Sequence, residues 1–363
     1  MAESRPAQPL PRAARRPPAA WPLAAGLVAG VVSDAVIGDP QRGHPVSAFG
    51  HLALALERRL YADSRLRGAG YAAACVALAA APGAAAGRLT RQRPWLTLAA
   101  VAVSTWAVTG ARSLAGEASA IGRELEHGDL AAARAALPRL CGRDPSGLGE
   151  KEIARAVVES VAENTSDAIV APLVWGAAGG PAALGAYRAV NTLDAMVGHR
   201  TPRLARFGWA AARADDVANW APARLTALLT AACAPVAGGR PAAAWRTAVR
   251  YGPCHPSPNA GWCEAAFAGA LGVRLGGTNF YAGTTEHRPE LGEGRAPEAA
   301  DIARAVRLCR AVTAVSTLAS AAAALLGGRG SAAAGPRAKG GPGRPGRPGR
   351  PGGAGHARGS DLR

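Results

Sequence analysis

Long stretches without a single charged residue dominate the pattern of the chain. The longest of them hold 15 to 20 residues, and they cover residues 68–87, 94–111, 168–187, 225–239 and 311–328. A helix that crosses a bilayer needs about 20 mostly apolar residues, whereas a soluble helix carries charges every turn or two on its wet face. The pattern therefore predicts an all-α polytopic membrane protein with about four to six membrane segments. An alanine-rich soluble bundle remains the alternative, because Ala adds little membrane affinity.

Two further segments have their own patterns. The apolar run 21–33 follows two arginines but has no small-residue cleavage site and stops at Asp34, so we expect a retained first membrane segment rather than a signal peptide. The run 168–187 contains Gly180 and Pro181, and polar motifs stand at both of its ends. Such a segment is predicted to be re-entrant, with an irregular backbone sheltered by protein.

The net charge of +17 suggests a nucleic-acid partner only until the charges are located. Most of the excess lies in two Pro-, Gly- and Arg-rich ends, residues 1–20 and 329–363, which are predicted to be disordered. Residues 21–328 then form one membrane domain, and no nucleic-acid partner is expected. The six cysteines are too scattered for a disulfide-rich scaffold.

A near-repeat is the strongest chemical signal. Asn-Thr-Ser-Asp-Ala at 164–168 recurs as Asn-Thr-Leu-Asp-Ala at 191–195, and Asp216 and Asn219 form a third pair with the same spacing. Residues three apart share a helix face, and carboxylate with carboxamide oxygens suit Mg²⁺. Helix caps and turns favour the same residue types, and that interpretation stays open.

Acidic residues also recur every four positions upstream of the first motif. Arg155, Glu159, Glu163 and Asp167 share one helix face, where like charges destabilise an isolated helix. A cation or an arginine against that face would relieve the repulsion, although a solvated acidic face is the simpler alternative.

Three loops carry further polar residues. Asp39 and His44 lie in a Gly/Pro-rich loop at a membrane end, where His44 is a candidate acid or base. His255, Asn259 and Glu264 fall in a turn-rich segment, and the glycines of 275–283 offer backbone amides of the kind that bind phosphate. Each of these features also has an ordinary structural interpretation.

Several blocks together resemble the CobD/CbiB family of cobalamin biosynthesis. The blocks are G-D-P-x-x-x-H-P-V (38–46), G-R-D-P (142–145), R-A-V-V-E-S-V-A-E-N-T-S-D-A (155–168), Y-R-A-V-N-T-L-D-A-M-V-G (187–198), D-D-V-A-N-W-x-P-A-R-L-T (215–226) and S-P-N-A-G-W-x-E-A-A-F-A-G-A-L-G-V-x-L-G-G (257–277). The resemblance extends over about residues 22–325, in order. Cys263 departs from it, because the family pattern has proline there.

The resemblance implies an integral enzyme of the cell membrane, an adenosylcobinamide-phosphate synthase. Such an enzyme joins the free propionate of adenosylcobyric acid to (R)-1-amino-2-propanol or its O-phosphate, and it consumes ATP with Mg²⁺. Association with other membrane enzymes of the late corrin pathway is a further implied partnership.

The resemblance also suggests roles for individual residues. Catalytic roles are predicted for Asp39, His44, Glu163, Asp167 and Asp194, of which the last three are the candidate metal ligands. Substrate or phosphate contacts are predicted for Arg143, Asn164, Arg188, Asn191, Asp216, Asn219, Asn259 and Glu264.

Two other classes compete with the synthase. A membrane prenyltransferase also uses Asp/Asn motifs and Mg²⁺, but its motifs are richer in acids than the two N-T-x-D motifs here. A membrane sensor with the same fold is the alternative without catalysis, and the presence of every polar block argues against it.

Overall fold

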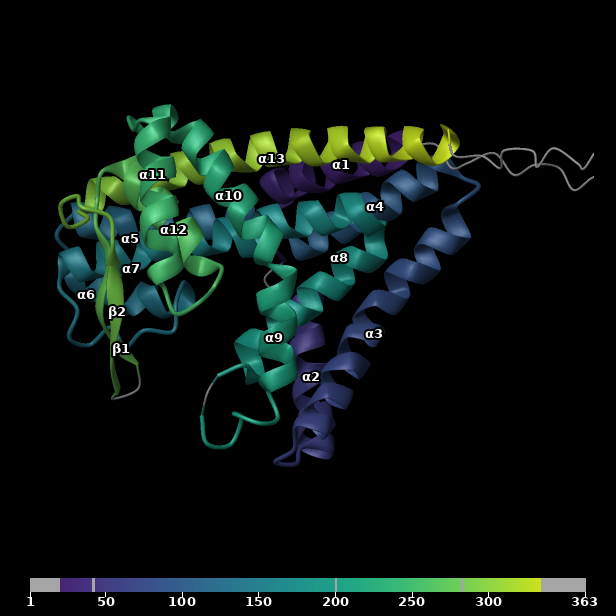
Figure 1. Cartoon of the computed structure of the whole chain (residues 1–363), viewed down its shortest axis with the longest axis horizontal. Coiled ribbons are helices and arrows are strands. Elements are labelled where there is room, and N and C mark those ends of the chain that lie inside the picture. Colours follow the sequence, from purple (N-terminus) through teal and green to yellow (C-terminus); the bar gives the residue numbers. More distant parts are fainter. Residues whose placement is uncertain (1–19, 41–42, 200, 282–283, 334–363) are drawn as a thin grey trace, which may run out of the picture.

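The computed structural model describes residues 20–40, 43–199, 201–281 and 284–333. Within these ranges the chain is almost entirely helical, so the predicted all-α class is confirmed (Figure 1). The N-terminal half contains α1 (Trp21–Ile37), α2 (Pro45–Leu60), α3 (Arg65–Thr90), α4 (Pro94–Val108), α5 (Ala111–Glu126), α6 (Leu130–Ala136) and α7 (Glu150–Thr165). After a π-helical segment (Ser166–Val170) follow α8 (Ala171–Val197), α9 (Trp209–Ala218), α10 (Trp220–Cys233), α11 (Pro241–Tyr251), α12 (Ala260–Leu271), the strands β1 (Leu275–Tyr281) and β2 (Thr284–Leu291), and α13 (Ala299–Ala333).

Four helical stretches are long and apolar enough to cross a membrane by length and composition. They are Arg65–Thr90, Pro94–Glu126, Glu150–Val197 and Ala299–Gly327, and the shorter apolar helix α1 accompanies them. The protein is thus an all-α polytopic membrane protein, as the uncharged runs predict. The shortest run, 225–239, falls in α10 and a following 3₁₀ turn, which are not among the four.

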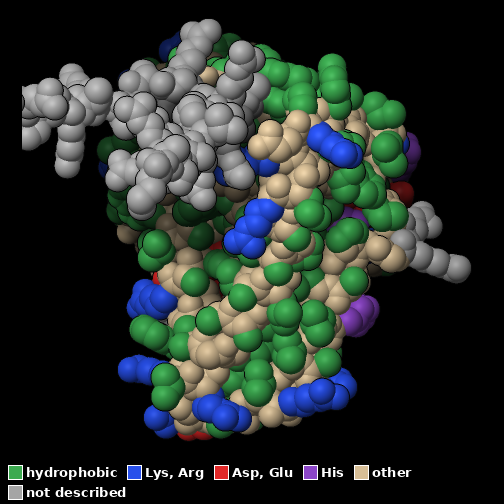
Figure 2. All heavy atoms as spheres, turned by 90° about the vertical axis from the view of Figure 1, so that its right-hand side faces the viewer, with side chains coloured by type: hydrophobic (Ala, Val, Ile, Leu, Met, Phe, Trp, Pro, Cys, Tyr) green, Lys and Arg blue, Asp and Glu red, His purple; other side chains and the backbone are tan. Residues whose placement is uncertain are grey.

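The surface agrees with this assignment. Figure 2 shows that the face at the right-hand end of Figure 1 is covered mostly by hydrophobic side chains, with basic side chains at intervals and very few acidic ones. Large apolar side chains stand exposed on α3 and α4, among them Leu89 and Trp95. Contact of such side chains with lipid is favourable, whereas their exposure to water is unfavourable.

Glycines let α1 and α4 approach closely. Gly26 and Gly30 lie one helical turn apart, and a Cβ atom added to either would lie 2.6 Å from the Cβ of Val101 or 2.4 Å from that of Thr105, respectively. Close backbone approach through small residues spaced by four is a common packing mode of membrane helices. The glycines of α1 are therefore required at this contact.

We expect Gly30→Ala to destabilise the protein by about 1–3 kcal/mol, because the added methyl group overpacks the contact with Thr105. Gly70→Ala is the matched control, since Gly70 of α3 has no atom within 4 Å of the added carbon. Thermal unfolding in detergent measures both. Equal melting temperatures for the two variants would contradict the prediction.

The backbone of α8 breaks inside the segment for which the sequence predicts re-entry. Gly180 has φ +62° and ψ −150°, and Pro181 starts the second half of the helix. In Figure 1 the chain turns back at this point, near α3 and α4. Gly83 of α3 allows the approach, because a Cβ there would lie 2.4 Å from the carbonyl carbon of Pro181. The turn brings the two ends of this segment, each with its polar motif, back towards each other.

Residues 275–283 were expected to form a glycine-rich loop, but the structure has β-strands in this region. β1 and β2 form an antiparallel hairpin with an irregular register between Leu275 and Gly277. Gly276 and Gly277 have φ of +81° and +87°, which glycine alone adopts readily. A main core lies beside the hairpin, and its fully buried side chains include Ile121, Ile153, Phe267 and Leu275.

The structure describes residues 20–333 of the chain apart from short gaps, and this range differs slightly from the predicted domain. Helix α13 continues to Ala333, beyond the predicted boundary at 328. Of the predicted disordered arms, 1–20 and 329–363, residues 1–19 and 334–363 lie outside the described residues.

Candidate functional site

An acidic cavity of about 210 Å³ lies where the two near-repeats meet. It receives side chains from the end of α7, the π-helical segment, the end of α8, α9, and the start of α12. The lining residues are Glu163, Ser166, Asp167, Asp194, Asp215, Asp216, Asn219, Ala223, Ser257, Asn259, Ala260 and Cys263. Six of the predicted site residues are thus brought together here.

Asparagine side chains link the acids of different helices. Asn191 of the second motif donates through Nδ2 to Asp167 Oδ2 of the first (3.1 Å) and to Asp215 Oδ1 (3.4 Å). Asn219 donates to the same Asp215 oxygen at 3.0 Å, and the Tyr187 hydroxyl donates to Asn219 Oδ1 at 2.8 Å. The carboxamides therefore hold the carboxylates of two segments, Asp167 and Asp215, around one space.

The cavity is rich in negative charge. Of its five carboxylates, Asp216 forms an ion pair with Arg213 (3.1 Å) at the rim. Burial, with a smaller contribution from the nearby Asp194 carboxylate, raises the pKa of Asp215 to about 7. Carboxylates at this density repel one another, and a bound cation would remove the repulsion.

The donor set suits Mg²⁺, which prefers hard oxygen ligands and keeps several of its waters. Among the described residues, no three His, Cys, Asp or Glu side chains converge closely enough to complete a metal site by themselves. An ion bound here would have to take its remaining ligands from water and from the phosphate oxygens of a substrate. Asp167 and Asp194 are the residues that would hold it, with Glu163 at the neighbouring wall.

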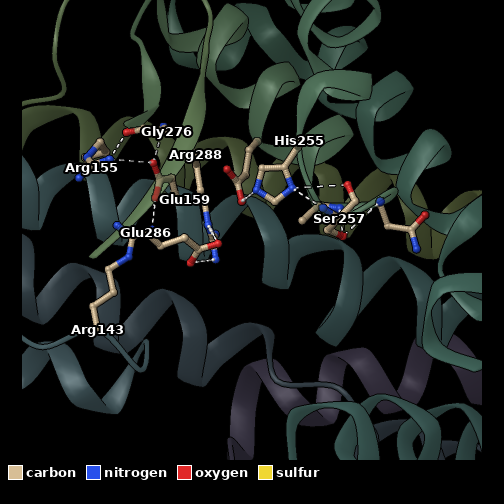
Figure 3. Close-up of polar contacts among 11 residues, drawn as sticks. Arg143, Arg155, Glu159, His255, Ser257, Gly276, Glu286 and Arg288 are labelled. Atoms are coloured by element: carbon tan, nitrogen blue, oxygen red, sulfur yellow. Dashed lines mark hydrogen bonds and ion pairs between the residues drawn. The ribbon is translucent and has the colours of Figure 1, made fainter. Parts of the chain in front are cut away.

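Glu163 connects the cavity with a second buried cluster, shown in Figure 3. The centre of this second cluster is Glu159, which pairs with Arg143 and accepts the Gly276 N–H at 2.6 Å. Arg155 donates to the carbonyl oxygens of Gly276 and Thr278 and so ties the hairpin to α7. The structure thus places Arg143 in a buried ion pair and not on the wall of the cavity where a phosphate would enter.

His255 and Glu264 belong to the same buried region. His255 Nε2 lies 3.9 Å from Glu264 Oε1, and both side chains are almost fully enclosed. Burial lowers the pKa of His255, while burial and the carboxylates of Glu159 and Glu163 raise the pKa of Glu264 well above its usual value. Burial therefore favours the neutral form of both groups. Glu264 does not line the acidic cavity.

Asn164 also lies away from the cavity. Its amide donates to Ser160 O at 2.9 Å within α7. A π-helical segment begins two residues later, at Ser166. Asp167 lines the cavity and Asn164 does not.

Asp39 and His44 form a separate pair at the connection from α1 to α2. His44 Nε2 lies 3.4 Å from Asp39 Oδ1, and Ser113 Oγ donates to Asp39 Oδ2 at 2.5 Å. His44 Nδ1 accepts the Val46 N–H at 3.2 Å, which caps α2. The imidazole is thereby oriented with Nε2 towards the acid.

Arg188 stands between this pair and the acidic cavity. Its Nη1 lies 3.5 Å from Asn191 Oδ1, and the carboxylates of Asp39 and Asp167 both attract the guanidinium. Its Nε has no hydrogen-bond partner among the described residues although it is buried. Arg188 is therefore the cation best placed to receive an anionic group of a substrate.

Some residues of the site were not assigned from the sequence. Asp215 is the clearest, since it lies four residues before Asn219, and this spacing on one helix face was the available signal. Arg288 of β2 pairs with Glu286 at 3.3 Å (Figure 3), and its positive charge acts on Glu163 and Glu264. It has no comparable signal, because only the hairpin brings it there.

Comparison with known proteins gives a consistent result. The family model described as CobD/Cbib protein matches residues 27–309. The chain is 53% identical over 284 residues to "Cobalamin biosynthesis protein CobD" of Mycobacterium tuberculosis (strain ATCC 25618 / H37Rv), a match that covers 78% of this chain and 90% of the relative. Proteins with the same name from Geobacter metallireducens and Rhodobacter capsulatus are 46% and 40% identical, over 75% and 78% of this chain and 87% and 92% of theirs. No solved structure matches the chain. All the polar blocks of the site lie within the matched range, and the chain belongs to the CobD/CbiB family.

Proposed function

We propose that this protein is a membrane-bound, ATP-dependent synthase of cobalamin biosynthesis. It joins the propionate carboxylate of adenosylcobyric acid to (R)-1-amino-2-propanol or its O-phosphate through an amide bond. Family membership supports the pathway. The observation that carries the chemistry is the cavity in which Asp167, Asp194 and Asp215 converge from three segments.

A carboxylate is a poor electrophile at neutral pH, so amide formation requires its activation. In the proposed reaction the carboxylate takes the terminal phosphoryl group of ATP and releases ADP. The amine then attacks the acyl phosphate, and phosphate and a proton leave as the amide forms. Bound Mg²⁺ supplies positive charge that neutralises phosphate oxygens during such a transfer.

In the proposed reaction, different residues bind the metal ion, the anionic substrate group and the amine. Asp167 and Asp194 would hold the ion, while Asn191 keeps Asp167 in place and Asn219 keeps Asp215 in place. Arg188 binds an anionic substrate group through its unpaired N–H. Asp39 and His44, on the other side of Arg188, hold the amine and take its proton.

The test uses purified protein in detergent with adenosylcobyric acid, ATP and Mg²⁺. Aminopropanol and aminopropanol phosphate are supplied in separate reactions, and the products are read by mass spectrometry. We expect an amide product with one of the two amines and none after chelation of Mg²⁺. No product from folded protein, under conditions in which an active family member forms it, would overturn the proposal and favour the sensor alternative.

A further inference from the structure

A second cavity, separate from the acidic one, lies between α1, α5 and α13. It is a groove of about 800 Å³. Its walls are mostly apolar, but three charged residues line it, namely Asp34, Arg112 and Arg310. None of the three has a role in the proposed reaction.

The three charges lie at one level of the membrane segments. Asp34 ends the uncharged run 21–33, Arg112 follows the run 94–111, and Arg310 precedes the run 311–328. Charged residues that border apolar spans lie at the depth of lipid headgroups. The charged end of the groove therefore lies at the membrane surface, and its apolar part extends along the spans.

One carboxylate oxygen of Asp34 lacks a hydrogen-bond donor among the described residues. Its side chain is fully buried, and its Oδ2 accepts the Arg112 N–H at 3.1 Å. Its Oδ1 has no hydrogen-bond partner among the described residues. A buried carboxylate oxygen without a donor is costly, and an ammonium group in the groove would satisfy it.

The two arginines offer donors to an anion. Arg112 Nη1 donates to the carbonyl oxygens of Ala35 and Val36 at 2.7 and 2.9 Å, and its guanidinium makes no other hydrogen bond within the described chain. Arg310 is exposed and forms neither an ion pair nor a hydrogen bond with any described residue. Guanidinium groups bind phosphate well because of their planar set of donors.

The remainder of the groove is apolar. Val28 and Val32 of α1 face Ala314 and Leu318 of α13 across it, and the side chains of Val32 and Leu318 are 54% and 67% exposed. A small soluble zwitterion would occupy only the charged end and leave this part empty. An acyl chain fits the apolar part.

We propose that the groove between α1, α5 and α13 binds an aminophospholipid of the phosphatidylethanolamine type. The ammonium group lies against Asp34 Oδ1, the phosphate lies between Arg112 and Arg310, and one acyl chain runs along Val28 and Leu318. The lipid would act as a structural partner that joins α1 to α13 at the membrane surface.

The experiment measures lipid binding to delipidated protein in detergent by native mass spectrometry, and no catalytic readout is needed. Phosphatidylethanolamine should bind at least about tenfold more tightly than phosphatidylcholine, whose quaternary ammonium has no N–H to donate to Asp34. Asp34→Asn should remove this preference. Arg310→Gln should weaken binding of both lipids about tenfold, while Arg307→Gln, an exposed arginine on the same helix outside the groove, should leave binding unchanged.

Two further measurements test whether a lipid occupies the groove. Ala314→Phe fills the apolar part without changing any charge, and it should displace the lipid even if Asp34→Asn fails to fold. Soluble phosphoethanolamine distinguishes the source of the headgroup, and it should not compete at the concentrations at which the lipid binds. Equal binding of both lipids to the wild type, retention of the lipid by Ala314→Phe, or effective competition by phosphoethanolamine would overturn the proposal.

Discussion

Replacing Asp167 by asparagine should lower the rate of amide formation by about 10²–10³-fold. The substitution keeps the size of the side chain and its place beside Asn191, but it removes the negative charge that would hold Mg²⁺. Losing one electrostatic contact to a transition state costs about 3–4 kcal/mol, which corresponds to this range. The initial rate with saturating substrates measures the effect, and the Mg²⁺ concentration for half-maximal rate should rise as well.

Asp63→Asn is the matched control for this experiment. Asp63 is exposed and pairs only with the exposed Arg206, so the same chemical change at this position should leave the rate unchanged. Size-exclusion chromatography verifies that both variants are folded. A near wild-type rate for Asp167→Asn would remove Asp167 from the metal site.

Replacing Arg143 by leucine should destabilise the protein by about 3–5 kcal/mol. The ion pair between Arg143 and Glu159 is almost completely enclosed, with 6% and 4% of the two side chains exposed. Removing Arg143 leaves the buried Glu159 carboxylate with the more distant Arg155 (3.9 Å) as its countercharge, and loss of the close partner is the costly case for buried ion pairs. Thermal unfolding in detergent measures the loss, and Arg139→Leu, which breaks an exposed pair with Glu117, should cost at most about 1 kcal/mol.

The double variant Arg143→Leu/Glu159→Leu separates a structural from a substrate-binding role. If Arg143 mainly neutralises Glu159, the second substitution should restore part of the lost stability. A folded, stable Arg143→Leu protein that has lost only its affinity for ATP or amine would instead support the phosphate contact that the sequence predicted.

Local features of the sequence predicted the helical elements well. The uncharged runs 68–87, 94–111, 168–187 and 311–328 all fall in the four stretches that can cross a membrane. Local information suffices here, because the length of an uncharged run between arginines depends on neighbouring residues alone.

The sequence did not predict the β-hairpin, because its formation depends on residues that are distant in the chain. Its residues lack an alternating pattern, and the strands are tied to α7 through Arg155, far away in the sequence.

The candidate site was predicted in its chemistry but not in its connections. The sequence marked Asp167 and Asn191 as members of similar motifs, and the turn at Gly180 is what brings them into contact. The same reasoning placed Asn164 beside Asp167, yet the Asn164 amide donates to Ser160 O within α7, and Asn164 does not line the cavity. Spacing along a helix indicates which residues share a face, but not which neighbours in space their side chains contact.

What the sequence alone determined is therefore the class of molecule, its membrane segments and the residue types available for catalysis. These depend on composition and on spacing within one helix. What the tertiary structure decided is which charges meet. It joined Arg143 to Glu159 in the interior, gathered Asp194 and Asp215 around one cavity, and set Asp39 apart behind Arg188. These choices depend on the packing of segments that are distant in the chain, because the energy of a charge is set by its neighbours in space.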